Sequence, residues 1–203
     1  MTTQADLAKY DVLLLIDKSG SMGEQDCPGG VSRWKYAQEA TEALARKAAE
    51  FDNDGITVVP FNNTYQVYEN VTPDKVHQVF TENEPNGGTN TALVLGYALD
   101  EYFAKKADGA KPRVILVITD GQPNDKQAVR DTIIKAANKL DEDGEIGISF
   151  IQVGKDVAAR AFLQELDDNL QSEGAKFDIV DTKTMDEMES MALADVLIAA
   201  LDD

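Results

Sequence analysis

Oxygen-bearing side chains follow the first long apolar run of this chain at a regular spacing. The apolar residues 12–16 lead directly into the sequence DKSGS at residues 17–21. Asp17, Ser19 and Ser21 are two residues apart, so an extended backbone would direct all three side chains to the same side. Hard divalent cations such as Mg²⁺ take oxygen ligands in near-octahedral geometry, and mixed hydroxyls and carboxylates suit them better than they suit Zn²⁺. The spacing therefore predicts a binding site for a hard divalent cation.

Two later loops place the same kinds of side chain beside glycine. Thr89 follows a Gly-Gly pair, and Asp120 stands between the apolar run 113–119 and Gly121. Each of these loops, taken alone, is also an ordinary helix cap or turn. If the apolar runs are parallel strands, the three loops meet at the carboxyl edge of one sheet, where ligands bind in doubly wound folds. Together the loops favour one shared site.

The rest of the chain alternates between strand and helix patterns. Apolar runs without alternation are typical of strands buried on both faces, whereas apolar residues at spacings of three and four predict helices. The predicted strands cover residues 12–16, 56–61, 64–69, 113–119, 146–153 and 177–180, and the predicted helices begin near residues 32, 73, 89, 125, 157 and 184. Alternating strands and helices predict an α/β fold, a doubly wound, mostly parallel six-stranded sheet with helices on both faces and a Rossmann-like arrangement. The strand at 64–69 follows a tight Asn-Asn turn and is expected to be the one antiparallel edge strand.

Charge excludes some classes of partner. The 203 residues include 37 acids and 19 bases, for a formal net charge of −18, and residues 141–203 alone hold 17 acids against 4 bases. Binding to phosphate groups requires the opposite sign of charge. The composition therefore excludes an unspecific binder of nucleic acid or of anionic membranes.

The sequence lacks the features of secreted and membrane proteins. Cys27 is its one cysteine, which excludes an intramolecular disulfide and is compatible with a reducing compartment. Residues 1–10 lack the basic and apolar regions of a signal peptide, and there is no apolar run of about 18 residues. We therefore expect a cytoplasmic protein that makes no membrane contact, built as one domain over residues 1–203 with a core of about residues 10–201.

The three loops resemble the metal-ion-dependent adhesion site (MIDAS) of von Willebrand factor type A (VWA) domains. The resemblance rests on DKSGS at residues 17–21, GGTNT at 87–91 and VITDG at 117–121, and it spans nearly the whole chain. It implies a single VWA domain with the Rossmann-like fold described above. Thr91, at the end of the second motif, is a weaker candidate and is expected to be a helix-cap neighbour of the site.

The resemblance implies a role for each candidate ligand. Ser19 and Ser21 would bind the ion through their hydroxyls, Thr89 directly or through water, and Asp17 and Asp120 mainly through waters. The implied ion is Mg²⁺, with Mn²⁺ or Ca²⁺ as alternatives, and similar domains leave one coordination position for a Glu or Asp of a protein partner. A mostly neutral set of ligands leaves the cation under-neutralised, which attracts an incoming carboxylate. Without a cation, Asp17 and Asp120 would be two like charges with nothing between them.

The sequence departs from extracellular VWA domains, which usually carry a signal peptide and flanking disulfides. It looks more similar to stand-alone bacterial or intracellular members, some of which are linked to metal stress or tellurium resistance and some to AAA-type ATPases. An insert at residues 24–30 adds Glu24, Asp26 and Cys27 beside the first motif. Glu24 or Asp26 would be either an extra ligand or part of a solvated loop.

Two functions of different classes are consistent with the motifs. The first is a binding module that recognises a partner through the cation and has no chemistry of its own. The second is a Mg²⁺-dependent phosphatase of the haloacid-dehalogenase type, which also begins with an aspartate after a buried strand. That class needs a second aspartate two positions further on, where this chain has Ser19, and an acidic pair for Mg²⁺, of which Asp120 is only one member. We therefore expect a non-enzymatic binding module, whose partner and oligomeric state the sequence leaves open.

Overall fold

One six-stranded sheet runs through the part of the chain that the computed structural model describes, residues 9–50, 55–184 and 187. Its strand order is β3-β2-β1-β4-β5-β6, and only β3 is antiparallel to its neighbour. The strands are β1 (Asp11–Asp17), β2 (Ile56–Phe61), β3 (Tyr68–Val71), β4 (Arg113–Thr119), β5 (Ile146–Gln152) and β6 (Val180–Thr184). The predicted sheet, mostly parallel with one antiparallel edge strand, is confirmed.

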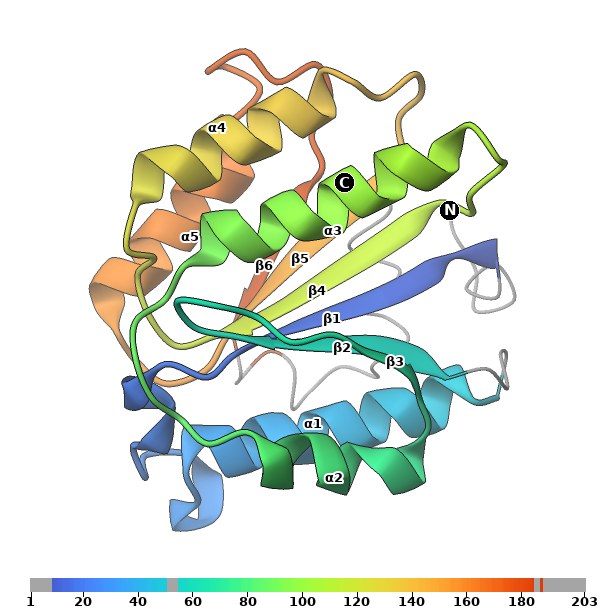
Figure 1. Ribbon diagram of the computed structural model, residues 1–203. Coiled ribbons are helices and arrows are strands. Elements are labelled where there is room, and N and C mark those ends of the chain that lie inside the picture. The colour runs from blue at the N-terminus through green and yellow to red at the C-terminus, as the bar shows by residue number, and fades with distance from the viewer. Residues whose placement is uncertain (1–8, 51–54, 185–186, 188–203) are drawn as a thin grey trace.

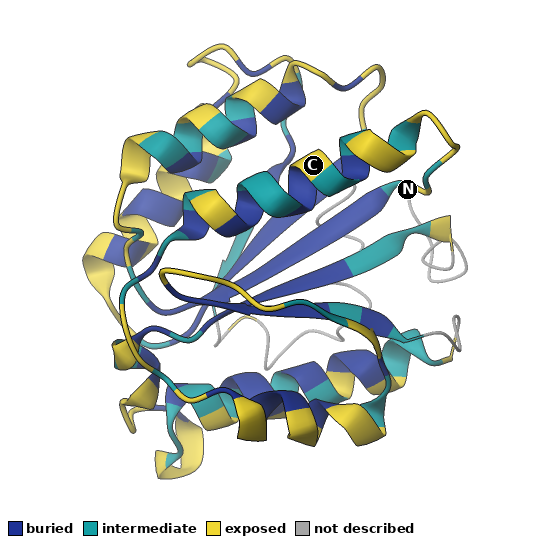
Figure 2. Ribbon diagram, in the orientation of Figure 1, coloured by how far each residue is buried: buried dark blue, intermediate teal, exposed yellow. Residues whose placement is uncertain are grey.

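Five α-helices of the described residues cover the two faces of this sheet (Figure 1). They are α1 (Arg33–Ala48), α2 (Pro73–Glu82), α3 (Thr91–Lys106), α4 (Lys126–Ala137) and α5 (Val157–Asn169). Helices α1 and α2 lie on one face and α3, α4 and α5 on the other, and exposed residues concentrate on their outer sides (Figure 2). The prediction of helices on both faces is confirmed. None of the helices described has the length and apolar character needed to cross a membrane.

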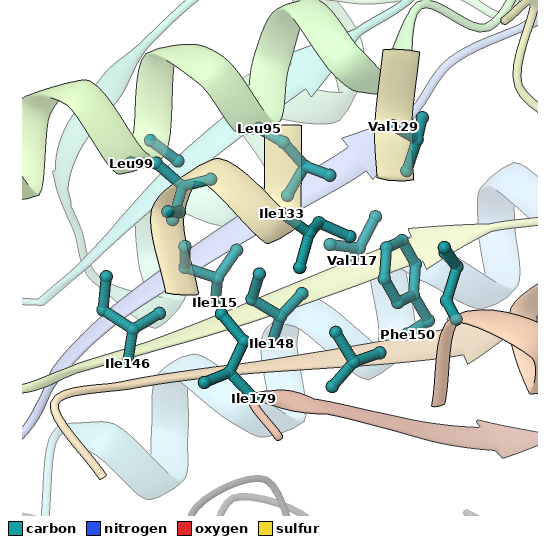
Figure 3. Packing of buried hydrophobic residues seen from close by; sticks show 14 of the residues in the cluster. Leu95, Leu99, Ile115, Val117, Val129, Ile133, Ile146, Ile148, Phe150 and Ile179 are labelled. Carbon is teal, nitrogen blue, oxygen red and sulfur yellow. The ribbon is translucent and has the colours of Figure 1, made fainter. Parts of the chain in front are cut away.

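The central strands separate two apolar cores. On β1, Leu13 and Leu15 pack towards α3, α4 and α5, whereas Leu14 and Ile16 pack towards α1 and α2. Figure 3 shows the larger core, in which side chains of α3 and α4 meet those of β4 and β5. Because successive side chains of a strand point to opposite faces, a strand covered on both sides needs an unbroken apolar run. The sequence of β1 satisfies this requirement.

The strand order reverses between β1 and β4. From β1 the chain proceeds outward to β2 and β3, and it then returns to β4 on the other side of β1 before proceeding to β5 and β6. Loops leaving two such neighbouring strands diverge to opposite faces and leave a crevice at their carboxyl ends. The loops after β1 and β4 are those that begin at Lys18 and Asp120.

Two strands lie several residues from their predicted positions, whereas β1 and β5 differ from theirs by at most one residue at each end. The edge strand was predicted at 64–69, but β3 covers Tyr68–Val71, and within the predicted segment Tyr65 makes an isolated antiparallel bridge to Phe61. The side chain of Asn62 accepts hydrogen bonds from Thr64 and holds residues 62–64 in a turn. The last strand was predicted at 177–180, but β6 covers Val180–Thr184. Most of β6 is polar, so the apolar pattern marked only its beginning. The terminal helix predicted from residue 184, with its Met185, Met188 and Met191, lies almost entirely outside the described residues.

Candidate metal centre

The loop after β1 turns sharply and is anchored in the core. A short 3-10 helix, η2 (Gly20–Gly23), follows the strand and lies in Figure 1 at the end of the sheet where the parallel strands finish. The side chain of Met22 is fully buried against the α1 side of the sheet. The backbone N–H of Met22 donates to the carbonyl of Ser19 at 3.1 Å, and that of Lys18 donates to the carbonyl of Phe61 at 2.8 Å. These contacts hold the two serines of the loop at the carboxyl ends of β1 and β4.

Asp17 is a buried carboxylate that organises the loop around it. Its side chain is fully buried, and its Oδ1 accepts the backbone N–H of Ser19 at 2.7 Å. Its Oδ2 accepts the hydroxyl of Thr119, at the end of β4, at 2.8 Å. Burial raises the pKa of Asp17 to about 6, against the opposing effect of these hydrogen bonds, and the charge of Asp120 raises it further. Asp17 therefore joins the ends of β1 and β4 and carries an ionised form that the metal-free protein stabilises poorly.

Three other candidate ligands form a chain of hydrogen bonds. The Oγ atoms of Ser19 and Ser21 are 3.1 Å apart, and the hydroxyl of Ser21 donates to Oδ1 of Asp120 at 3.0 Å. Ser19 and Asp120 are buried, with 3% and 1% of their surfaces exposed, while Ser21 is half-buried. Burial raises the pKa of Asp120 above its ordinary value. The structure thus brings hydroxyl and carboxylate oxygens from two distant parts of the chain into contact.

Thr89 lies in the adjoining loop, where its backbone is hydrogen-bonded to Asn124. Its N–H donates to the side-chain oxygen of Asn124 at 3.0 Å, and its carbonyl accepts the N–H of Asn124 at 2.8 Å. The preceding loop is also tied to the first motif, because the N–H of Gly20 donates to the carbonyl of Gly87 at 3.2 Å. A Cβ at position 88 would lie 2.9 Å from the side-chain oxygen of Asn63 and 3.0 Å from that of Asn124, so a larger residue here would displace the ends of these two side chains. Thr91 begins α3 and is buried, and the helix cap beside it is Asn90.

Arg33 is a feature of the site that the sequence reasoning missed. It begins α1 behind the N-cap residue Ser32, and its Nη1 donates to Oδ2 of Asp120 at 2.7 Å. We expected Asp17 and Asp120 to be two like charges with nothing between them. This expectation was wrong for Asp120, because the buried guanidinium of Arg33 contacts its second carboxylate oxygen. The sequence offered one indication of this role: Arg33 is the one basic residue between Lys18 and Lys35, and the other charged residues of that segment are acidic.

The guanidinium of Arg33 also pairs with the acidic side chains of the insert. Its Nε and Nη2 donate to the two carboxylate oxygens of Asp26 at 2.9 and 2.6 Å, and Nη2 lies 2.9 Å from Oε2 of Glu24. Glu24 and Asp26 were open between an extra ligand and a solvated loop, and the structure favours the loop: both residues are exposed, and both also pair with Arg33. Cys27 is buried, and burial raises the pKa of its thiol.

Asn124, which contacts the Thr89 loop, is a second residue of the site that the sequence reasoning missed. Nothing in the sequence distinguished it from an ordinary turn residue.

The donor set matches a hard cation better than a soft one. Across residues 9–50, 55–184 and 187, the structure has no group of three or more His, Cys, Asp and Glu side chains placed to hold a metal. The oxygens that do converge are two hydroxyls and one carboxylate, with a second carboxylate directly beneath them. Such a set lacks the nitrogen and sulfur atoms that favour Zn²⁺, while Mg²⁺ commonly keeps several waters beside a few protein oxygens. The residues present therefore fit an ion of the Mg²⁺ type.

Known structures share this fold at low sequence identity. A mutant of the PilB minor pilin from Streptococcus sanguinis superposes with a TM-score of 0.62 and 15% identity, over 96% of this chain and 60% of the pilin chain. Manganese-loaded TRAP protein from Plasmodium vivax gives a TM-score of 0.58 and 18% identity, over 89% of this chain and 70% of its own. Proximal thread matrix protein 1 of the mussel byssus, with a zinc-occupied MIDAS motif, gives 0.58 and 16%, over 95% of this chain and 47% of its own. This chain thus spans less than two thirds of two of these three proteins.

The family follows from a match to nearly the whole chain. The model of the von Willebrand factor type A domain matches residues 11–190, from the start of β1 to beyond β6. The match covers all six strands and the three loops that meet at the carboxyl edge of the sheet. The sheet order and the helices on both faces agree with it. The chain is a member of the von Willebrand factor type A domain family.

Proposed function

We propose that this chain is a protein-binding module that depends on a divalent metal and has no catalytic activity of its own. Ser19 and Ser21 would hold an ion of the Mg²⁺ type through their hydroxyls, Thr89 directly or through water, and Asp17 and Asp120 mainly through waters. The observation that carries the proposal is the hydrogen-bonded chain from Ser19 through Ser21 to Asp120, which joins two loops about a hundred residues apart at one sheet edge. When bound, the ion would supply a positive charge that a partner's carboxylate can coordinate.

The residues of the site prepare this binding in different ways. Asp17 orients the loop through the backbone of Ser19, and it lies too deep to meet a partner itself. Ser21 is half-buried and is the most accessible of the two serines and two aspartates. Because hydroxyls are neutral, they leave the charge of a cation incompletely compensated, which favours an anionic residue at the open position. A Glu or Asp of the partner is therefore the expected recognition element.

Mg²⁺ is the proposed ion, with Mn²⁺ and Ca²⁺ as alternatives. The manganese of the Plasmodium vivax TRAP structure and the zinc in the mussel protein support a divalent ion in this family. We further propose that residues 1–203 form one domain that acts in the cytoplasm, where a buried, unpaired Cys27 is stable as a thiol. The resemblance to stand-alone members suggests a partner in a stress-response or AAA-ATPase system.

Metal binding is testable without knowledge of the partner. An ion that binds only the folded protein raises the melting temperature with its concentration. We expect Mg²⁺ and Mn²⁺ to raise the melting temperature of the wild type, and Ser19→Ala with Ser21→Ala to remove most of that increase. Ser172→Ala, an exposed serine near the end of α5, is the matched control and should respond as the wild type does. If none of Mg²⁺, Mn²⁺ and Ca²⁺ shifts the wild type, the proposed site does not bind metal.

The partner experiment tests recognition separately. Affinity capture with the wild type should retain a partner in Mg²⁺, lose it with a chelator and regain it when Mg²⁺ is restored. The double serine variant should lose the partner while its circular dichroism spectrum and metal-free melting temperature stay close to those of the wild type. Full retention of the partner by that variant in the presence of chelator would place the interface elsewhere on the domain.

A further inference from the structure

One guanidinium joins the candidate metal centre to the insert beside it. Arg33 is 8% exposed, and it contacts carboxylates of three residues: Asp120 at 2.7 Å, Asp26 at 2.6 Å and Glu24 at 2.9 Å. Its Nη1 also lies 3.4 Å from the carbonyl oxygen of Ser21. The positive charge is therefore held within the network that contains two of the candidate ligands.

The surroundings of Arg33 leave it little freedom to move. A side chain at Gly154, in the loop after β5, would come within 2.7 Å of the Arg33 Nε, so the guanidinium fills the space above that glycine. The backbone N–H of Arg33 donates to the carbonyl of Glu24 at 2.9 Å. The bidentate pair with Asp26 adds directional constraint, since both oxygens of that carboxylate are engaged. These contacts hold the guanidinium of Arg33 beside Asp120.

We infer that Arg33 is a built-in counter-charge that lowers the cation affinity of this site and keeps a bound ion under-neutralised, with Glu24 and Asp26 moderating the effect. The inference rests on the metal site proposed above. Asp120 alone would offer a full negative charge to a cation, but a guanidinium on its second oxygen offsets much of that charge. A weaker hold on the ion and a stronger attraction for a partner's carboxylate then have the same electrostatic origin.

The acids of the insert act on the ion through Arg33 in this scheme. Asp26 is the more buried of the two and makes the bidentate contact, so it compensates most of the guanidinium charge. Removing that carboxylate leaves Arg33 more positive and should weaken cation binding, although Asp26 is not a ligand. Removing Arg33 should do the opposite. If either residue had only a structural role, the two substitutions would not be expected to change the cation affinity in opposite directions.

The test is a Mn²⁺ titration of the full chain followed by electron paramagnetic resonance, in which the signal of the free ion reports the unbound concentration. Arg33→Gln should bind Mn²⁺ roughly tenfold more tightly than the wild type, because one positive charge is removed within a few ångströms of the site. Asp26→Asn should bind it more weakly by roughly threefold. Lys35→Gln makes the same charge change at an exposed position of α1 and should leave the affinity nearly unchanged.

The double variant Arg33→Gln with Asp26→Asn separates this scheme from direct ligation. It restores the net charge of the wild type and should bind Mn²⁺ within about threefold of it. An affinity far below the wild type would identify Asp26 as a ligand and overturn the inference, as would an Arg33→Gln variant that binds Mn²⁺ equally or less tightly. The metal-free melting temperature of each variant shows whether it is folded. If Arg33→Gln is not folded, Asp26→Asn still tests the inference, because an affinity equal to or above that of the wild type would overturn it. If the wild type does not bind Mn²⁺ at all, the proposed metal site fails as well.

Discussion

Replacing Asp17 by Asn should stabilise the metal-free protein at neutral pH. Asp17 is fully buried, and its ionised form accepts hydrogen bonds from the backbone N–H of Ser19 and the hydroxyl of Thr119. An Asn side chain keeps both, because its carbonyl oxygen accepts the Ser19 N–H and its amide donates to a rotated Thr119 hydroxyl. The substitution therefore removes a buried charge while preserving the loop geometry.

The size of the effect follows from the pKa of Asp17. Burial raises this pKa from 3.8 to about 6 in the folded protein, so ionised Asp17 lowers the free energy of unfolding by about 3 kcal/mol, at about 1.4 kcal/mol per pH unit. The full penalty applies above pH 6, where the carboxyl is ionised in both states. It decreases as the pH falls from 6 to 4, because the folded protein takes up a proton first, and it is absent below the unfolded-state pKa. Weaker hydrogen bonds to neutral Asn offset about 1 kcal/mol, leaving a gain of about 2 kcal/mol.

The assay is urea denaturation of the wild type and of Asp17→Asn between pH 4 and pH 8, with a chelator present. The difference in unfolding free energy should favour Asp17→Asn at pH 8 and shrink as the pH falls through 6. Asp100→Asn, which removes an exposed acid of α3, controls for the general change in charge. A difference that does not vary with pH, or an Asp17→Asn protein less stable than the wild type at pH 8, would refute the reasoning.

Three further changes test other parts of the structure. Gly88→Ala should displace the ends of the Asn63 and Asn124 side chains, weaken the contact of Asn124 with Thr89 and lower Mn²⁺ affinity severalfold with little change in melting temperature, and an unchanged affinity would contradict the role given to this contact. Ile133→Ala, in the core between α4 and the sheet, should cost about 2–5 kcal/mol in urea denaturation, and a loss below 1 kcal/mol would mean that the cavity closes. Arg113→Ala should cost about 2 kcal/mol, less than for a fully buried pair because water reaches the carboxylates of Asp11 and Glu101 that it leaves behind, and a neutral result would show that solvent compensates fully.

The central strands could be predicted because their apolar runs can be buried in few other ways. The unbroken apolar run of β1 can be buried only if both faces of the strand are covered, which implies a central strand of a parallel sheet. The beginnings of α1, α4 and α5 were predicted to within a residue or two, because polar residues at their N-caps precede clear helical spacing. The edge strands were less predictable, because β3 and β6 contain polar residues, and pairing decides where each begins.

The candidate ligands were also open to prediction from local sequence. Asp17, Ser19 and Ser21 are spaced so that their side chains face the same way, and recognising this spacing requires no knowledge of distant residues. The juxtaposition of Ser21 with Asp120 depends on β1 and β4 being neighbours, which the alternation of strands and helices implied. Their proximity in the structure agrees with that expectation, while their role as metal ligands stays a proposal.

By itself, the sequence determined the elements, the two-sided burial of the central strands and the chemical types of side chain at the carboxyl edge of the sheet. These properties depend on local pattern, and each short segment carries enough of it to be recognised. Only the tertiary structure decided that Arg33 rather than solvent meets Asp120, that Glu24 and Asp26 bind Arg33, and that Asn124 holds the Thr89 loop. Such contacts join residues far apart in the chain, and their energies depend on burial and on distances of a few ångströms, which no local pattern encodes.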